Sequence, residues 1–234
     1  MDGSCNKKHP VLAVVGPTAS GKTALGVALA EQFGGEIISA DSMQIYKGLD
    51  VGTAKVTPEE TCGIPHHGVD ILQPDEPFSV ADFTALAGAL EHYRATGKKL
   101  SEQKADSLPP EKPYRSLILG LDFPERAQLY RRIDLRVDQM MEQDLLNEAK
   151  RVWEHRDTYK TAAQAIGYKE FFPYFAGESA LAPCVEKLKQ ASRNYAKRQL
   201  TWFRPMEGIC WLDASAPDVR EQAAHLTNEF LAKG

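Results

Sequence analysis

The 234 residues are enough to bury a core and to form one elaborated domain, or a domain with a small lobe. Hydrophobic residues make up 43% and charged residues 26%, with a formal net charge of -4, and these values exclude disordered, coiled-coil and collagen-like chains. The cysteines lie far apart without a Cys-x-x-Cys pair, which argues against a zinc site or a disulfide framework. No run resembles a signal peptide or a membrane span, so we expect a cytosolic protein.

An apolar strand, a glycine-rich turn and a helix are predicted at the start of the chain. Val11–Val15 has the short, partly β-branched pattern of a buried strand, and Gly16 ends it. A helix is predicted from Lys22 to about Phe33, and strand-like runs follow at 36–39 and 68–72. This alternation predicts an α/β fold with a parallel sheet and right-handed crossovers.

The rest of the chain is mainly helical in pattern. Ser79 is a good N-cap for a helix from Val80 past Leu90, and the polar stretch 98–113 is interpreted as a linker. Strands are predicted at 116–121 and 209–212. Helical spacing is found from Pro124 through Val152 and again at 161–172, 182–202 and 219–232.

A phosphate-binding motif lies between the first strand and the first helix. Its glycines let backbone N–H groups curl around phosphate oxygens, its lysine supplies a point charge, and the threonine hydroxyl can ligate magnesium. The alternative is a chance glycine-rich turn, and the motif alone does not say which phosphate compound binds. The motif consists of Gly16, Pro17, Thr18, Ala19, Ser20, Gly21, Lys22 and Thr23.

An aspartate follows the second predicted strand. Side chains at the carboxyl ends of parallel strands project into the ligand crevice, which places Asp41 there. It could hold magnesium through water or act as a general base. The alternative is a turn or helix-cap aspartate.

Several longer segments, in order, resemble the tRNA dimethylallyltransferase family. The resemblance implies a P-loop NTPase-like fold and transfer of a dimethylallyl group from dimethylallyl diphosphate to N6 of the adenine just 3′ of a tRNA anticodon, with Mg²⁺. The P-loop would then hold the diphosphate of the prenyl donor. The segments are Gly16–Thr23, Ile38–Lys55, Ile64–His67 with Val69–Asp70, Phe78–Phe83, Ile166–Lys169 and Ala196–Arg204.

The resemblance also implies roles for single residues. By similarity Asp41 is the base that takes the proton of the adenine amine, Lys22 and Arg132 bind the diphosphate, and Thr23 ligates Mg²⁺. Arg132 has an alternative role as part of a solvated, charge-neutral helix face. The residues implied to contact tRNA are Asp41, Ser42, Met43, Gln44, Ile166, Gly167, Tyr168, Lys169, Lys197, Arg198, Gln199, Thr201, Trp202 and Arg204.

A basic stripe in the predicted helix 182–202 independently suggests an anionic partner. Lys189, Arg193, Lys197 and Thr201 recur every four residues, with Arg204 close to the same line. Cations could neutralise RNA phosphates while nearby aromatic rings stack on loop bases. The alternative is an ordinary solvated helix face.

The chain departs from the family pattern near Leu90. A strand, a Gly-Gly-Thr-Gly-Leu-Tyr-like motif and a helical insertion that the family places there are missing, so residues 1–123 are expected to form a P-loop core with a join near residue 90. Residues 124–234 are expected to form a helical part that completes the core and contacts tRNA. The loss of an interior strand brings the activity of this chain into question.

Two other functions remain open from the sequence. One is an adenylate isopentenyltransferase or a nucleotide kinase acting on free nucleotide, against which the basic helix argues. The other is a tRNA-binding remnant without catalysis, suggested by the missing segment. The family resemblance implies a monomer that binds tRNA and dimethylallyl diphosphate and no membrane.

Overall fold

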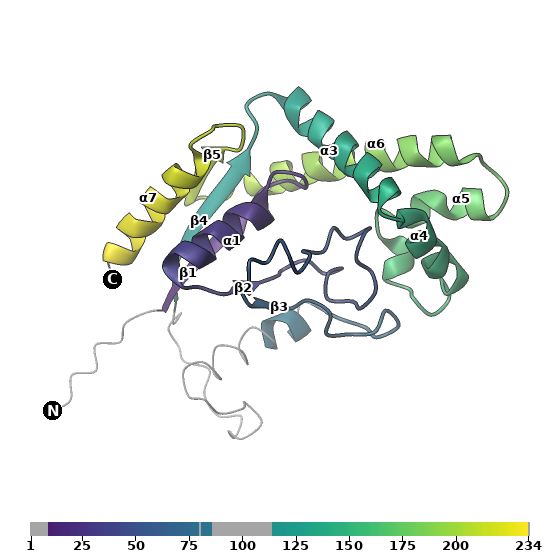
Figure 1. Cartoon of the computed structure of the whole chain (residues 1–234), viewed down its shortest axis with the longest axis horizontal. Helices are drawn as coiled ribbons and strands as arrows, with labels where there is room; N and C mark the ends of the chain where they lie inside the picture. Colours follow the sequence, from purple (N-terminus) through teal and green to yellow (C-terminus); the bar gives the residue numbers. More distant parts are fainter. Residues whose placement is uncertain (1–8, 80, 86–113, 234) are drawn as a thin grey trace, which may run out of the picture. The chain divides into compact units, whose positions relative to one another are not determined.

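The computed structural model describes residues 9–79, 81–85 and 114–233, and the chain forms two compact units (Figure 1). The first unit comprises 1–34, 107–133 and 193–234, and the second comprises 35–106 and 134–192. Each unit takes segments from both predicted parts, 1–123 and 124–234, so those domain boundaries stay a prediction. The join near residue 90 and the linker 98–113 lie outside the described residues.

A parallel sheet lies in the first unit, as the sequence predicts. It consists of β1 (His9–Val15), β4 (Tyr114–Asp122) and β5 (Ile209–Asp213), in the order β1-β4-β5. The seven residues of β1 pair in register with β4, from His9 opposite Tyr114 to Val15 opposite Gly120. All three strands are parallel.

The expectation that β1 is buried is wrong. Val11 is 40% exposed and residues 12–15 are only half-buried. Within the described residues β1 pairs with β4 alone, and it stands at the end of the strand order. An end strand is covered less than an interior strand, so its apolar pattern does not ensure full burial.

Two helices of the first unit pack against the sheet. α1 (Lys22–Phe33) has the predicted bounds, and Gly34 caps it in the left-handed conformation, its N–H bonding to the carbonyl of Ala30. α7 (Val219–Ala232) also has the predicted bounds. Leu25 of α1, Leu119 of β4 and Ala223 of α7 meet in one buried cluster.

A second cluster in this unit joins the first part of α3 (Arg126–Glu142) to the last part of α6 (Leu181–Phe203). Leu129 and Ile133 of α3 contact Ala196 and Leu200 of α6, together with Phe123. These contacts fix the helix segments that carry Arg132 and the predicted tRNA contacts of α6.

The second unit contains a small parallel sheet of β2 (Ile37–Ile38) and β3 (His66–His67). The prediction of a strand at 68–72 is wrong, because Gly68 and Asp70 have φ values of +77° and +54° and interrupt the extended chain. Only an isolated bridge joins Leu72 to Tyr46 there. β2 therefore pairs with β3 and belongs to a different sheet from β1.

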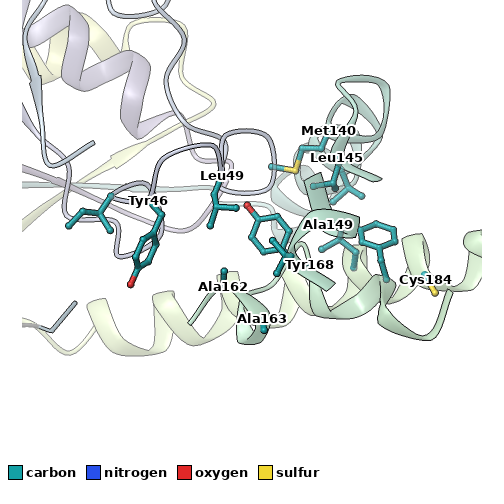
Figure 2. Close-up of a cluster of buried hydrophobic side chains, with 14 residues drawn as sticks. Tyr46, Leu49, Met140, Leu145, Ala149, Ala162, Ala163, Tyr168 and Cys184 are labelled. Atoms are coloured by element: carbon teal, nitrogen blue, oxygen red, sulfur yellow. The ribbon is translucent and has the colours of Figure 1, made fainter. Parts of the chain in front are cut away.

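The hydrophobic core of the second unit is shown in Figure 2. It gathers residues of the loop after β2, of α3, of α4 (Leu145–Glu154) and of α6 around the ring of Tyr168. Tyr46, Leu49, Met140, Leu145, Ala149, Ala162, Ala163, Tyr168 and Cys184 belong to it.

The predicted helices of the second unit are partly wrong. The pattern after Pro124 forms two helices, α3 and α4, because Asp144 adopts a φ of +71° between them. The predicted helix 161–172 is replaced by η2 (Ala162–Gln164), η3 (Lys169–Phe171) and α5 (Phe172–Phe175). Gly167, at a φ of +110°, breaks the helical path.

Ser79 caps a helical turn as predicted. The Ser79 hydroxyl accepts from the N–H of Asp82 at 3.2 Å, and the Asp82 carboxylate accepts from the N–H of Ser79 at 2.8 Å. This reciprocal capping fixes the helix start, and residues 81–85 are helical.

Candidate functional site

The predicted P-loop lies between β1 and α1, where the phosphate-binding motif requires it. Gly16 has a φ of +148°, and a Cβ at this position would lie 2.5 Å from the carbonyl oxygen of Leu121. Gly21 has a φ of +92° and Ala19 a φ of +63°. The backbone therefore curls as a cradle that only a glycine-rich sequence can form.

Side chains with N–H donors hold this loop. The Lys22 ammonium donates to the carbonyl oxygens of Gly16 at 3.0 Å and Pro17 at 2.8 Å. Arg132 of α3 donates through Nε to the carbonyl of Ala19 at 3.0 Å. These contacts bring two cations of the same unit to the loop, as the family resemblance implies for a diphosphate site.

Gln199 of α6 also contacts the loop. Its Oε1 accepts from the N–H of Thr18 at 2.9 Å. The resemblance places Gln199 among the tRNA contacts, yet the side chain braces the P-loop. Sequence reasoning missed this role because 181 positions separate the two residues.

The side-chain hydroxyls of the P-loop indicate whether the loop fits a diphosphate and a magnesium ion. Ser20 Oγ is buried and has no hydrogen-bond partner within the described part of the chain, so a phosphate oxygen would satisfy it. Thr23 is exposed in the first turn of α1. Mg²⁺ prefers oxygen ligands and keeps several waters, so one hydroxyl and diphosphate oxygens form a suitable set.

The second candidate centre is the loop after β2, in the second unit. Asp41 and Ser42 are exposed, and the Asp41 carboxylate accepts from the N–H of Met43 at 2.8 Å. This local turn orients the carboxylate and leaves its second oxygen to accept a proton or another bond.

Gln44 anchors the same loop from inside. Its Oε1 accepts from the Ser39 hydroxyl at 2.9 Å, and its Nε2 lies 3.3 Å from the carbonyl oxygens of Thr53 and Ala54. Both ends of the amide are therefore engaged within the protein. We expect Gln44 to shape the loop at least as much as it contacts a ligand.

Arg136 of α3 lies in the electrostatic field of Asp41. Burial lowers the pKa of the guanidinium, while the charges of Asp41 and Glu60 oppose this shift. Arg136 remains a cation at any working pH, so its positive charge acts on the Asp41 carboxylate. Sequence reasoning assigned Arg136 no role, because a second arginine four residues after Arg132 looks like an ordinary helix-face charge.

A buried carboxylate that the sequence did not single out fixes the chain beyond this loop. Glu148 of α4 accepts from the backbone N–H groups of Asp50 at 2.8 Å, Val51 at 3.0 Å and Gly52 at 2.8 Å. It also accepts from the hydroxyl of Tyr168 at 2.8 Å. Four donors thus satisfy one buried acid, and no ligand is needed to complete the group.

Further contacts reinforce the segment after β2. The Lys55 ammonium donates to the carbonyl of Tyr46 at 2.8 Å and pairs with Asp50 and Asp70. Arg151 of α4 donates to the carbonyl of Gly48 at 2.9 Å. The loop that carries Asp41 is therefore continuous with a rigidly bonded segment.

The predicted tRNA segment 166–169 is only partly accessible. Tyr168 is fully buried, and burial followed by the nearby Glu148 charge raises the pKa of its hydroxyl. Gly167 is buried and Lys169 is exposed. A direct RNA contact by Tyr168 is therefore incompatible with its position, because its ring belongs to the core.

The predicted basic stripe of α6 divides into two groups. Lys197, Arg198 and Thr201 are exposed, and Trp202 is 70% exposed. Arg204 donates to Asp122 at 2.8 Å. This end of the helix retains the exposed cations and aromatic surface expected of an RNA contact.

Lys189, at the other end of the predicted stripe, is engaged within the second unit. Its ammonium lies 2.7 Å from Asp138 and 3.8 Å from Glu186, and hydrogen bonding to Asp138 raises its pKa. An ammonium held in this way is not available to phosphate without breaking its ion pairs.

The described part of the chain has neither a metal-binding cluster nor a membrane-spanning helix. Among residues 9–79, 81–85 and 114–233, no three His, Cys, Asp or Glu side chains gather as a metal-binding cluster. None of the described helices combines the length and the apolar character that a bilayer-spanning segment needs.

Comparison with known proteins places these features in one family. A model described as "IPP transferase" matches residues 44–90 and 86–206, and one described as "Isopentenyl transferase" matches 9–66. A relative called tRNA dimethylallyltransferase from Geobacillus thermodenitrificans is 38% identical over 289 positions, covering 89% of this chain and 91% of that protein. Another from Halalkalibacterium halodurans is 34% identical, covering 97% and 98%.

Solved structures give the same result. A tRNA isopentenylpyrophosphate transferase from Bacillus halodurans has a TM-score of 0.81 at 33% identity and covers 97% of this chain and 96% of that chain. A eukaryotic dimethylallyltransferase acting on tRNA has a TM-score of 0.80 at 25% identity, covering 96% and 80%. The likeness supports the P-loop NTPase-like α/β fold that the sequence predicts.

The comparisons also bear on the missing segment. The two IPP transferase matches meet at residues 86–90. The alignment of 289 positions exceeds the 234 residues of this chain, so it includes positions where this chain has no residue.

Proposed function

Because the chain belongs to the IPP transferase family, we propose that it is a tRNA dimethylallyltransferase, which prenylates an adenine in tRNA. The single observation that carries this is the joining of Arg132 and Lys22 to the P-loop of a chain whose relatives bear that name. In this function the donor is dimethylallyl diphosphate, and the acceptor is N6 of the adenine 3′-adjacent to the anticodon.

The P-loop unit would hold the leaving group. As the allylic C–O bond breaks, negative charge develops on pyrophosphate, and Lys22, Arg132 and the backbone of the cradle stabilise that charge. The Ser20 hydroxyl would donate to a phosphate oxygen. Bound Mg²⁺, held by Thr23 and diphosphate oxygens, would supply further charge neutralisation.

Asp41 would act on the acceptor. The exocyclic amine of adenine is a weak nucleophile, so loss of its proton must accompany formation of the new N–C bond. The exposed Asp41 carboxylate accepts that proton, with the Met43 N–H fixing its orientation and the Arg136 cation acting on it electrostatically. Proton, leaving group and electron pairs then balance without an oxidant or a reductant.

The tRNA contacts would come from exposed or partly exposed residues of both units. Asp41, Ser42 and Met43 would lie near the acceptor base, and Lys169 would contact the backbone. Lys197, Arg198, Thr201 and Trp202 of α6, with Arg204 just after that helix, would bind the anticodon stem-loop through phosphate pairing and stacking. We also propose that the protein is a monomer and that it acts in the cytoplasm.

A direct experiment incubates the chain with labelled dimethylallyl diphosphate, Mg²⁺ and an anticodon stem-loop. The Asp41→Asn variant is expected to lose about 10²- to 10⁴-fold in rate. Asp75→Asn, at an exposed aspartate, is the matched control and should react as the wild type does. Equal rates for wild type and Asp41→Asn would refute the role of Asp41.

The same assay separates the competing functions. Free AMP, ADP and ATP replace the stem-loop in a parallel series, because the sequence leaves a transferase acting on free nucleotide open. Product only with RNA supports the proposal. Stem-loop binding without product would indicate a binding remnant, in line with the family segment that is missing near Leu90.

A further inference from the structure

A hollow of about 300 Å³ in the first unit is not used by the diphosphate or proton-transfer chemistry. It lies between α3 and the end of α6. Its floor is apolar, formed by the buried side chains of Leu129 and Leu200, and the ring of Tyr130 lines it as well. Such a surface suits one face of a flat, unstacked ring.

Cations surround this floor. Arg126, Lys197 and Arg204 line the hollow, and Arg204 is neutralised by Asp122 at 2.8 Å. Within the described residues, Arg126 and Lys197 have no ion-pair partner. Arg126 and Lys197 therefore add two positive charges to the lining, and these charges favour an anionic partner.

Among the described residues that line the hollow, there is no aspartate or glutamate. A site for the acceptor adenine needs a group that takes a proton, so this hollow lacks the chemistry of an acceptor site. It retains the chemistry of a binding site for a base and its phosphate.

We propose that this hollow binds one unpaired nucleotide of the tRNA anticodon loop other than the acceptor adenine. The base would stack over Leu129, Leu200 and the ring of Tyr130, and Arg126 and Lys197 would pair with its flanking phosphates. The proposal rests on the proposed function. It adds Arg126 and Tyr130 to the RNA-binding residues and gives Lys197 a defined partner.

The test measures the affinity of the full chain for an anticodon stem-loop by fluorescence anisotropy at several salt concentrations. Arg126→Gln is expected to weaken binding about tenfold and to reduce the slope of log affinity against log salt by about 1. Arg131→Gln, an exposed arginine on the same helix, is the matched control and should change neither quantity by much. Lys197→Gln is a second variant with the effect expected of Arg126→Gln.

A panel of stem-loops identifies the bound nucleotide. Each carries one abasic loop position, and the acceptor is left intact. For the wild type, one position is expected to weaken binding about tenfold. In the Arg126→Gln and Tyr130→Ala variants, the same abasic position should lower the affinity little further, because the contact between that base and the pocket is already lost.

Each outcome decides the proposal. If the effects of Arg126→Gln add fully to those of every abasic position, or if Arg126→Gln binds normally, the pocket assignment is wrong while the proposed function stands. If free AMP displaces the stem-loop at micromolar concentration through Arg126, the hollow is a site for free nucleotide and the RNA assignment is wrong. If the wild type binds no stem-loop, both the pocket and the proposed function fall.

Discussion

Two loops of this chain are completed in opposite ways. In the P-loop, Lys22 and Arg132 bring positive charge to a cradle shaped by Gly16, and the buried Ser20 hydroxyl has no partner among the described residues. In the loop Asp50–Gly52, three successive N–H groups bind the buried carboxylate of Glu148.

The difference distinguishes a ligand site from a structural one. Backbone N–H groups surround an anion in the second loop, and we propose the same physical device for the P-loop. Where the protein supplies the anion itself, the loop is complete and contributes to stability. Where the protein supplies cations, as in the P-loop, the proposed diphosphate would supply the anion, and the loop would contribute to binding.

The largest expected effect comes from removing the Glu148 carboxylate, which the loop Asp50–Gly52 binds. Glu148→Ala leaves three N–H groups and the Tyr168 hydroxyl without their acceptor, so we expect the free energy of unfolding to fall by about 3 to 5 kcal/mol. Urea denaturation measures the free energy of unfolding. Glu154→Ala, at an exposed position of the same helix, should change stability by less than about 0.5 kcal/mol. Equal stability of the two variants would contradict the structural role of Glu148.

Removing a charge from the P-loop should have the opposite result: a large loss of activity with little change in stability. Lys22→Met is expected to lower the single-turnover rate about 10²- to 10³-fold, because the developing charge on pyrophosphate loses a cation. The free energy of unfolding should change by less than about 1 kcal/mol, since the bonds from the ammonium to the carbonyl oxygens of Gly16 and Pro17 lie within one loop. A stability loss as large as that of Glu148→Ala would show that Lys22 is a structural residue.

A smaller change tests the Glu148 group through pH. Tyr168→Phe removes one of four donors, and we expect a loss of about 1 to 2 kcal/mol at pH 8. Burial and Glu148 raise the pKa of the Tyr168 hydroxyl above its ordinary 10.0. The folded protein therefore keeps this proton while the unfolded chain loses it, so wild-type stability is full below pH 10 and declines as pH rises above 10.

The Tyr168→Phe variant lacks this titration, and its stability should decline less steeply above pH 10. Denaturation curves at pH 8 to 11 make the comparison. Tyr174→Phe, a partly exposed tyrosine, is the control and should follow the wild type. If the stability of the wild type and of Tyr168→Phe declines equally steeply above pH 10, the Tyr168 hydroxyl is not buried and bonded to the Glu148 carboxylate.

The sequence predicted what depends on neighbouring residues. The P-loop, the bounds of α1 and α7 and the Ser79 cap each follow from a pattern within a few positions. The helix predicted over 161–172 failed because Gly167 has a positive φ that an apolar periodicity does not reveal.

The parts that were missed depend on distant pairings. Glu148 resembles any acid on an amphipathic helix, and its partners lie 96 to 98 positions earlier. Tyr168 belongs to a segment matched to tRNA contacts, but its ring fills the core and its hydroxyl serves Glu148. The burial of β1 was overestimated because strand order, which the sequence does not specify, determines which strand stands at an edge.

The smallest expected effect extends the same distinction to the basic stripe. Lys189 is already paired with Asp138 at 2.7 Å, so Lys189→Ala should change stem-loop affinity less than about twofold and leave its salt dependence unaltered. Lys197→Ala should weaken binding several-fold and reduce the salt slope by about 1, because no described carboxylate neutralises that ammonium. Anisotropy titrations at 50 and 200 mM salt compare the two. Similar losses for both lysines would mean that the Asp138 ion pair opens to RNA, and that pairing within the protein does not predict which cations bind.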